Sequence, residues 1–464
     1  MAETPGGPWV KVGSGSSTSR ASASRRSSKP MRRVLMVSPH FPPDSSAASH
    51  RVRLLAPHLE AAGWSPTVVT LEPSAYEGRL DPDLAALVPE SLRVVRAPAW
   101  RAGLTRRAGL GDLGLRAFTG LRHTCRALLS REHFDALFIT VYPVYPALLG
   151  AGLKADYRVP FVLDYQDPWV GAWGESVGSG PNGAPDWKSR ASRGLGTWLE
   201  PKAIGAADAM VAVSQGTIDG IVQRIPAAAR LPHAVIPLGF EPDDFAALRA
   251  RPPRRAHFNP ADGLVHLCYV GTLLPTGVET LRLLFRALAR ARRDDPAAAQ
   301  VRCHFFGTSN QSDSDAYRVL PVARACGVAD AVSEVPGRLD YLDALSVLTQ
   351  ASGILLLGSS ERHYTASKLY PALLAKRPVL ALFHEGSSVV SILRAAGSEP
   401  SVRVVTYGDE AIDDRRVAET ACHLRALASA GVYDPANVSL DCIARVSALQ
   451  LAGQLAEIFN RVGA

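Results

Sequence analysis

The chain has 464 residues, of which 47% are apolar and 7% aromatic, and its formal net charge is +8. This length allows two large domains with complete cores, and no apolar run approaches the roughly 18 residues of a membrane-spanning helix. The six cysteines form no CxxC pair and no cysteine–histidine cluster with metal-ligand spacing. We therefore expect a cytoplasmic protein with reduced, buried thiols and no bound metal, and not an integral membrane protein.

Residues 1–30 are rich in serine, glycine, alanine and arginine and show no apolar periodicity. This composition is typical of a disordered tail. A transit peptide is the alternative, although the segment lacks a clear amphipathic helix. We expect the first domain to span residues 31–240.

The first folded segment reads as a strand (34–37), a proline-containing loop, an amphipathic helix (48–62) that ends at Gly63, and a second strand (66–71). In such doubly wound sheets, ligands bind beyond the carboxyl ends of the strands. The loop that contains His40 and Ser46 is therefore predicted to face a cleft. His40 is either a ligand contact or a residue that packs the loop.

Seven arginines alternate with leucines between Arg101 and Arg131. A basic amphipathic helix lies on a membrane surface when its apolar face is exposed, and is an ordinary solvated helix when that face is buried. Both readings remain open. Nucleic acid is not favoured as a partner, because no aromatic stacking residues are interleaved with these arginines.

The apolar run 160–163 predicts a strand that delivers Asp164, Gln166 and Asp167 to the cleft. Asp167 could accept a hydrogen bond from a substrate hydroxyl or orient a reacting group. The alternative is an aspartate that caps the following turn. Residues 170–190 are rich in glycine, serine and proline and predict a mobile loop at the cleft mouth.

After a proline-rich boundary near residue 250 the α/β pattern restarts, so we expect a second domain over residues 241–438. The expected strands are HLCYVG (266–271), VRCHFFG (301–307) and 354–357, and the expected helices are 279–290, 317–326 and 343–350. The last segment, 439–464, is amphipathic and long enough to return to the first domain.

The stretch from Gly353 to Glu385 predicts a strand, a polar loop, a helix over 367–375 and a second strand over 378–383. The loop places Lys368 at a helix N-terminus, where unpaired backbone N–H groups and the helix dipole favour phosphate. We predict that this stretch binds a diphosphate group.

Seven segments in this order resemble a retaining GT-B glycosyltransferase of family 4. They are PHFPPDSSAASHRV, DYQDPW, ADAMVAVS, VIPLGF, YVGTL, VPGRLDYLDALSVLTQA and SKLYPALLAKRPVLAL. The resemblance implies an α/β protein of GT-B architecture, with two doubly wound Rossmann-like domains facing across a cleft. It also implies transfer of a sugar from a nucleotide diphosphate sugar to an acceptor hydroxyl, with retention at the anomeric carbon and without metal or cofactor. In that chemistry the leaving phosphate takes the acceptor proton.

From the loops and the resemblance together we expect Lys368 to stabilise the leaving diphosphate and Asp167 to orient sugar hydroxyls. The expected donor-binding residues lie on the second domain and are Gly271, Thr272, Gly337, Arg338, Ser360, Glu361, Thr365, Ala366, Ser367 and Leu369. The expected acceptor-side residues lie on the first domain and are His40, Ser46 and Gln166.

Four features depart from the family pattern. Pro371 stands where relatives carry a glutamate that holds the donor ribose, and His363 stands where they carry its partner glutamate, although Glu361 is close enough to substitute. Gln166 replaces a frequent cleft histidine, and the loop TLLPTG lacks a basic pair. A catalytically degenerate nucleotide-sugar-binding or scaffold protein, or a nucleotide-sugar epimerase of GT-B fold, are therefore the alternatives to a transferase. For a transferase we expect a lipid-linked or glycan acceptor in cell-envelope polysaccharide or glycolipid synthesis, and contact with the anionic inner face of the plasma membrane.

Overall fold

The computed structural model describes residues 31–106, 111–170, 187–252, 256–309, 317–359, 368–410, 412–430 and 433–463, with side chains of the 187–206 helix described from residue 194. Arg32–Ala464 form one contact unit, which contains both sheets of the fold. The expected tail (1–30) and most of the expected loop at 170–190 lie outside the described residues.

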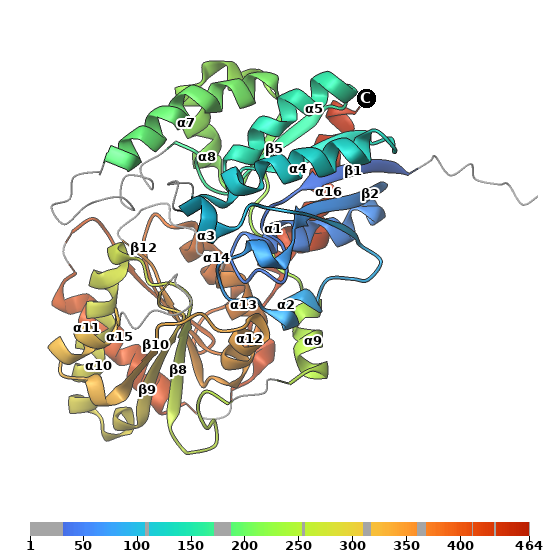
Figure 1. Cartoon of the computed structure of the whole chain (residues 1–464). Helices are drawn as coiled ribbons and strands as arrows, with labels where there is room; N and C mark the ends of the chain where they lie inside the picture. Colours follow the sequence, from blue (N-terminus) through green and yellow to red (C-terminus); the bar gives the residue numbers. More distant parts are fainter. Residues whose placement is uncertain are drawn as a thin grey trace, which may run out of the picture. The chain divides into compact units, whose positions relative to one another are not determined.

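The first sheet is parallel and has the order β3-β2-β1-β4-β5-β6-β7 in the described part of the chain (Figure 1). Its strands are β1 (Arg32–Val37), β2 (Trp64–Leu71), β3 (Arg93–Ala97), β4 (Ala136–Thr140), β5 (Phe161–Tyr165), β6 (Ala209–Ala212) and β7 (His233–Val235). The central strands are apolar on both faces, as expected for a parallel sheet covered by helices on both sides.

Alternate residues of β1 face two different helical layers. Leu35 and Val37 belong to a core formed with α4 (Leu113–Leu129), α5 (Leu149–Tyr157), α7 (Trp187–Ala206) and α8 (Gln215–Arg224). Val34 and Met36 belong to a core formed with α1 (Ser49–Leu55) and the C-terminal helix α16 (Ala448–Val462). The end of the chain thus packs on the first sheet.

The second sheet is also parallel, with the order β10-β9-β8-β11-β12-β13. Its strands are β8 (Val265–Val270), β9 (Val301–Phe306), β10 (Val332–Val335), β11 (Gly353–Leu357), β12 (Val379–His384) and β13 (Val402–Tyr407). One face packs on α10 (Val278–Asp294), α11 (Leu320–Ala325) and α15 (Asp414–Ala428), and the other on α9 (Asp243–Ala250), α12 (Tyr341–Gln350), α13 (Leu369–Leu374) and α14 (Ser388–Ala396).

Both sheets reverse their strand order at one point, between β1 and β4 in the first and between β8 and β11 in the second. Connections run to opposite faces on the two sides of such a point, which leaves a crevice at the carboxyl ends of the strands. The prediction of two doubly wound Rossmann-like halves is confirmed. The exact domain boundary near residue 240 stays a prediction.

Several element predictions need correction. The helix expected over 48–62 ends at Leu55 and continues as two 3-10 turns, Ala56–His58 and Glu60–Ala62. Pro57 explains the break, because it has no N–H to donate within a helix. The strand before the IPLGF segment, β7, ends at Val235.

The thiols are not all buried. Cys125, Cys268 and Cys303 are buried as expected, whereas Cys422 is exposed and Cys326 and Cys442 are partly exposed.

The arginine-rich segment contains α4, whose apolar side is buried. Leu121, Cys125 and Leu129 belong to the core of the first sheet. Arg116 is also buried and donates hydrogen bonds to the carbonyl oxygen of Trp100 and to the Glu77 carboxylate. For α4 the structure therefore supports the reading of an ordinary solvated helix, and the membrane-surface reading of its apolar face is wrong.

Two histidines on neighbouring strands of the second sheet form a hydrogen-bonded chain that should make stability depend on pH. His266 Nδ1 lies 2.9 Å from His304 Nε2, while His266 Nε2 lies 2.9 Å from Asp262 and His304 Nδ1 lies 2.6 Å from Ser333 Oγ. Burial, with repulsion from His266, lowers the pKa of His304 from its ordinary 6.5 to about 4.

Because unfolded His304 binds a proton more readily than folded His304, its contribution to stability is lost as pH falls from about 6.5 to about 4. We expect the unfolding midpoint of the wild-type chain to drop more steeply over this range than that of His304→Gln. Parallel urea titrations at pH 7 and pH 5 measure the difference. If the unfolding midpoint fell by the same amount between pH 7 and pH 5 in both proteins, His304 would not contribute to the pH dependence of stability.

Candidate functional site

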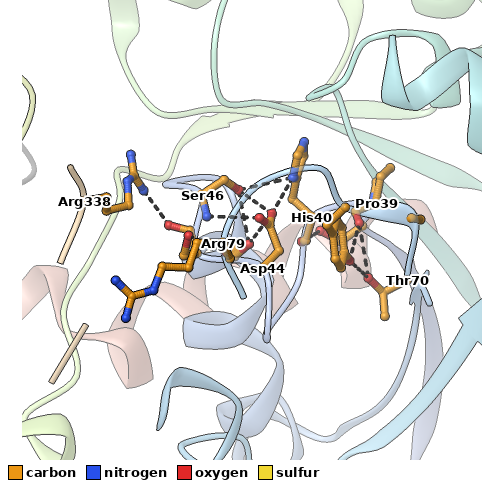
Figure 2. Close-up of polar contacts among 12 residues, drawn as sticks. Pro39, His40, Asp44, Ser46, Thr70, Arg79 and Arg338 are labelled. Carbon is orange, nitrogen blue, oxygen red and sulfur yellow. Dashed lines mark hydrogen bonds and ion pairs between the residues drawn. The ribbon is translucent and has the colours of Figure 1, made fainter. Parts of the chain in front are cut away.

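The loop after β1 is organised by a buried carboxylate, Asp44 (Figure 2). Asp44 Oδ2 lies 2.6 Å from His40 Nδ1 and accepts hydrogen bonds from the hydroxyls of Ser46, at 2.6 Å, and Ser49, at 2.9 Å. Burial acts to raise the pKa of Asp44, but the hydrogen bonds and charge of His40 and the two serine hydroxyls outweigh it and lower this pKa. Asp44 is therefore an ionised hub that fixes the loop.

Tyr142, from the loop after β4, contacts His40 and interacts electrostatically with Asp44, Asp167 and Arg338. Its ring centroid lies 5.4 Å from that of His40. Burial raises the pKa of the Tyr142 hydroxyl, and the charges of Asp167 and Asp44 raise it further, while that of Arg338 opposes them. Residues that follow β1, β4 and β5 thus influence one another at the carboxyl edge of the first sheet.

Asp164 does not reach the crevice, contrary to expectation. It is fully buried on β5 and forms an ion pair with Arg51 of α1, whose Nη2 lies 2.6 Å from Asp164 Oδ1. Arg51 also donates to the backbone carbonyls of Ile236 and Pro237. The arrangement satisfies both buried charges and ties three elements together, so the role of Asp164 is structural.

Lys368 lies over the loop that follows β8. Its Nζ donates to the hydroxyl of Tyr269 at 2.6 Å and to the carbonyl of Thr272 at 3.2 Å, and it lies 4.4 Å from the centre of the Tyr269 ring. Gly271 permits this approach, because a Cβ added there would come within 3.0 Å of Lys368 Nζ. Gly271 also has φ +134°, a backbone conformation that other residues rarely adopt.

A cavity of about 480 Å³ joins the carboxyl ends of the two sheets. It is lined by several of the expected site residues: Asp167, Gly271, Thr272, Arg338 and Lys368, together with Pro371. Most of its remaining lining residues are apolar, and the largest groups come from α12, β11, α1 and the segment 238–241. A pocket with apolar walls and a few convergent charged groups is the usual form of a small-molecule site.

The two halves also contact each other directly beside the cavity. Arg338 donates a hydrogen bond to the backbone carbonyl of Ser45, in the loop after β1. Arg79 Nη2 lies 2.6 Å from Asp340, and the Tyr341 amide donates to Asp81 at 2.7 Å. The loop after β10 and the start of α12 therefore lie against loops of the first half.

Charges that line the cavity are partly desolvated. Burial raises the pKa of Asp167, so its carboxylate is less well solvated than an ordinary surface aspartate. Burial lowers the pKa of Arg338, and the nearby carboxylate of Asp44 partly offsets this. Burial, with the charge of Arg53, holds the pKa of His50 well below its usual range, so His50 is neutral at pH 7. Charges in such surroundings act on a ligand more strongly than in water.

Other expected site residues are placed differently. The Ser46 hydroxyl donates a hydrogen bond to Asp44. The side chain of Leu369 is fully buried in the core of the second sheet. Gln166 has a buried Nε2 without a hydrogen-bond partner among the described residues. Gly337 precedes Arg338 in the loop after β10. Ser360, Glu361, Thr365, Ala366 and Ser367 lie outside the described residues.

Three residues of the site escaped the sequence analysis: Asp44, Tyr142 and Tyr269. Asp44 lies four residues after His40 in the same loop, and this spacing is the signal that could have paired them. Tyr142 follows β4, and the rule that ligands bind beyond the carboxyl ends of strands, which we used for His40, applies to Tyr142 as well. Tyr269 is buried within β8, and nothing in its local pattern distinguishes it from a core residue.

Among the described residues, no group of three or more histidine, cysteine, aspartate or glutamate side chains is arranged to hold a metal ion. None of the described helices is both long enough and apolar enough to cross a membrane.

Several solved structures are similar to this chain over almost its whole length. HepE from Anabaena, in complex with UDP and glucose, is 15% identical with a TM-score of 0.51, and the match covers 92% of this chain and 98% of that one. The UDP-forming α,α-trehalose-phosphate synthase of Burkholderia xenovorans is 11% identical with a TM-score of 0.54, and the match covers 94% and 100%. The N-terminal domain of Candida albicans trehalose-6-phosphate phosphatase is 10% identical with a TM-score of 0.55, covering 92% and 97%. The fold is therefore GT-B.

Residues 46–239 match the family model described as "Glycosyl transferase 4-like domain". No curated protein matches the sequence significantly. The chain thus has the GT-B fold, and its residues 46–239 are similar to a glycosyl transferase 4-like domain, in agreement with the resemblance in its motifs.

Proposed function

We propose that the chain transfers a sugar from a nucleoside diphosphate sugar to an acceptor hydroxyl with retention of configuration. The observation that carries this proposal is the cavity that brings Lys368 and Arg338 of the second half together with Asp167 of the first. The glycosyl transferase 4-like domain supports transfer, and the complex of HepE with UDP-glucose supports a uridine-linked donor.

Lys368 and Arg338 stabilise the negative charge that develops on the leaving diphosphate, and no metal ion is needed. Both groups are already held in place, Lys368 by Tyr269 and Thr272 and Arg338 by the Ser45 carbonyl. Positioned cations stabilise developing negative charge without reorganising during the reaction. Asp167 accepts hydrogen bonds from sugar hydroxyls. Gln166, whose Nε2 has no partner within the described part of the chain, donates one to the acceptor.

The acceptor is a lipid-linked or glycan hydroxyl of the cell envelope, reached at the inner face of an anionic membrane. With the apolar side of α4 buried, the membrane contact falls instead on Trp100 and Leu104, whose side chains are 53% and 68% exposed beside Arg101 and Arg106. Exposed aromatic and basic residues are typical of membrane-interface contacts.

Flotation with vesicles of anionic and of zwitterionic lipid tests the membrane contact. We expect binding to anionic vesicles that weakens in salt and in the double variant Trp100→Ser, Leu104→Ser. Absence of binding at low salt would point to an acceptor in solution.

Release of nucleoside diphosphate from UDP-, GDP- and ADP-sugars, with mixed glycan and glycolipid acceptors, tests the transfer. Turnover should persist in EDTA, and the anomeric configuration of the product, read by NMR, should match that of the donor. A metal requirement or an inverted product would each contradict the corresponding part of the proposal.

Pro371 favours one other candidate function. It lines the cavity at the position where the resemblance expects a ribose-binding glutamate, so a protein that binds a nucleotide sugar without transferring it is the second candidate. Tight donor binding without release of nucleoside diphosphate would support this candidate. Interconversion of a nucleotide sugar without an acceptor would instead indicate an epimerase.

A further inference from the structure

We propose that His50 of α1 recognises the base of the donor nucleotide by donating a hydrogen bond from its Nε2 to a keto oxygen. Uracil, thymine and guanine carry this oxygen where cytosine and adenine carry an amino group. The inference rests on the proposed transferase function and deepens it, because it assigns a class of base to the donor site. His50 selects donors with a keto base over donors with an amino base.

The cavity that contains Lys368 continues inward and leaves room for a nucleoside beyond the diphosphate. Its lining follows one face of α12, through Tyr341, Leu345 and Leu348. Leu348 follows Tyr341 by two helical turns, which is about 11 Å along the helix axis. His50 lines the same cavity from the first half of the chain. A base that enters between the two halves therefore comes within reach of His50.

Arg53 determines which nitrogen of His50 carries the proton. Burial, with the charges of Arg53 and Arg338, holds the pKa of His50 well below its usual range, so the imidazole is neutral and has one N–H. Arg53 Nη2 lies 3.3 Å from His50 Nδ1, and because a guanidinium can only donate, Nδ1 is the accepting nitrogen. The proton therefore lies on Nε2, which has no hydrogen-bond partner within the part of the chain that the structure describes.

Arg53 is itself held in place, so the orientation of His50 is set before a ligand binds. Its Nη1 and Nη2 lie 2.9 and 2.8 Å from the two carboxylate oxygens of Asp244, and the two side chains are 3% and 4% exposed. The Tyr341 hydroxyl donates to Asp244 at 2.7 Å. The Tyr341 ring centroid lies 4.7 Å from that of His50, which restricts rotation of the imidazole.

The polar groups around His50 favour a ligand oxygen over an amino group. Asp81, which lines the cavity, already accepts hydrogen bonds from two backbone amides. Asp244 is occupied by Arg53 and Tyr341. Among the described residues, the side-chain nitrogens without a partner at this wall are Arg53 Nε and His50 Nε2, and both are donors. A base that presents an amino group here would leave the His50 donor unpaired.

Calorimetric titration of the full chain with UDP, CDP, GDP and ADP tests the inference without requiring the sugar or the acceptor. UDP and CDP are the decisive pair, because their bases differ only at the edge that carries the keto or the amino group. We expect the wild-type chain to bind UDP more tightly than CDP by about 5–150-fold, which is the usual effect of leaving a buried donor unpaired. GDP should likewise bind more tightly than ADP.

Two variants should remove this preference in different ways. His50→Leu deletes the donor, so the affinity for UDP should fall to about that for CDP. In His50→Gln the side-chain amide offers both an N–H and a carbonyl oxygen. We therefore expect UDP binding to be retained and CDP binding to become tighter. If either variant weakened all four nucleotides by the same factor, His50 would have only a structural role and the inference would be wrong.

His133→Leu is the matched control, because His133 also belongs to the first half but is 81% exposed and does not line the cavity. Its affinities should equal those of the wild type. Equal binding of UDP and CDP by the wild-type chain would overturn the base preference and leave the transferase proposal intact. If no nucleoside diphosphate bound, the proposed donor site would fail and the inference with it.

A spectroscopic measurement reports the hydrogen bond directly. In the full chain labelled with ¹⁵N-histidine, the resonances that disappear in His50→Gln belong to His50. We expect them to report a proton on Nε2 at neutral pH and to move when UDP is added, with a smaller change for CDP. A proton on Nδ1, or no response to UDP at saturation, would contradict the proposed contact.

Discussion

Lys368→Ala should lower turnover by about 10²–10³-fold and abolish the thermal stabilisation that the donor gives the wild-type chain. The loss of one positioned donor to developing negative charge has about this effect on rate. Lys368 is held by the Tyr269 hydroxyl and by the backbone carbonyl of Thr272, the first residue of the neutral loop that follows Gly271. Calorimetric titration of the donor and release of nucleoside diphosphate measure the two effects separately.

Lys376→Ala provides the control from the other end of the same segment. Lys376 follows α13 and is exposed, so removing it changes the net charge by the same amount without touching the cavity. Donor affinity and turnover should stay at wild-type values. If both lysine variants lost the same amount of affinity, a general charge effect would explain the result better than a site at Lys368.

Asp164→Asn should lower the free energy of unfolding by about 3–5 kcal/mol, which is the usual cost of removing one partner of a buried ion pair. The substitution leaves the Arg51 guanidinium, 1% exposed, without its countercharge. Urea unfolding followed by far-UV circular dichroism measures the effect. Donor binding by the fraction that remains folded should be unchanged, because Asp164 does not line the cavity.

The exposed pair of Arg126 and Asp156 is a matched comparison. Its nitrogen–oxygen distance is 2.9 Å, but the two side chains are 43% and 41% exposed. Exposed pairs contribute only about 0–1 kcal/mol, so Asp156→Asn should have a small effect on the unfolding midpoint. A loss in Asp164→Asn no larger than in Asp156→Asn would show that the buried pair does not hold β5 and α1 together.

Much of the fold could be predicted because the central strands are short apolar runs followed by loops. β1, β4, β8 and β11 all stand out in this way, and their order along the chain predicts two doubly wound sheets. β3 was missed because it is an edge strand on which exposed Arg93 and Arg96 flank two adjacent, partly buried valines. Its pattern matches a surface loop as well as it matches a strand.

The site was less predictable, because its geometry depends on contacts between distant segments. Asp164 and Asp167 are three residues apart and look equivalent in the sequence, yet one pairs with Arg51, 113 residues away, and the other lines the cavity. Tyr269 became recognisable only through Lys368, 99 residues further along the chain. Local patterns place a loop at the end of a strand, but they do not show which of its side chains turn inward.

The most direct test of the central claim is a thermal-shift screen of the wild-type chain against UDP-, GDP- and ADP-sugars. A ligand that binds only the folded state at 100 times its dissociation constant stabilises it by about 2.7 kcal/mol. We predict a clear rise of the unfolding temperature with one class of donor, and no rise with the same donor in Lys368→Ala. If no nucleotide sugar shifted the wild-type chain, the cavity between the two sheets would not be a donor site.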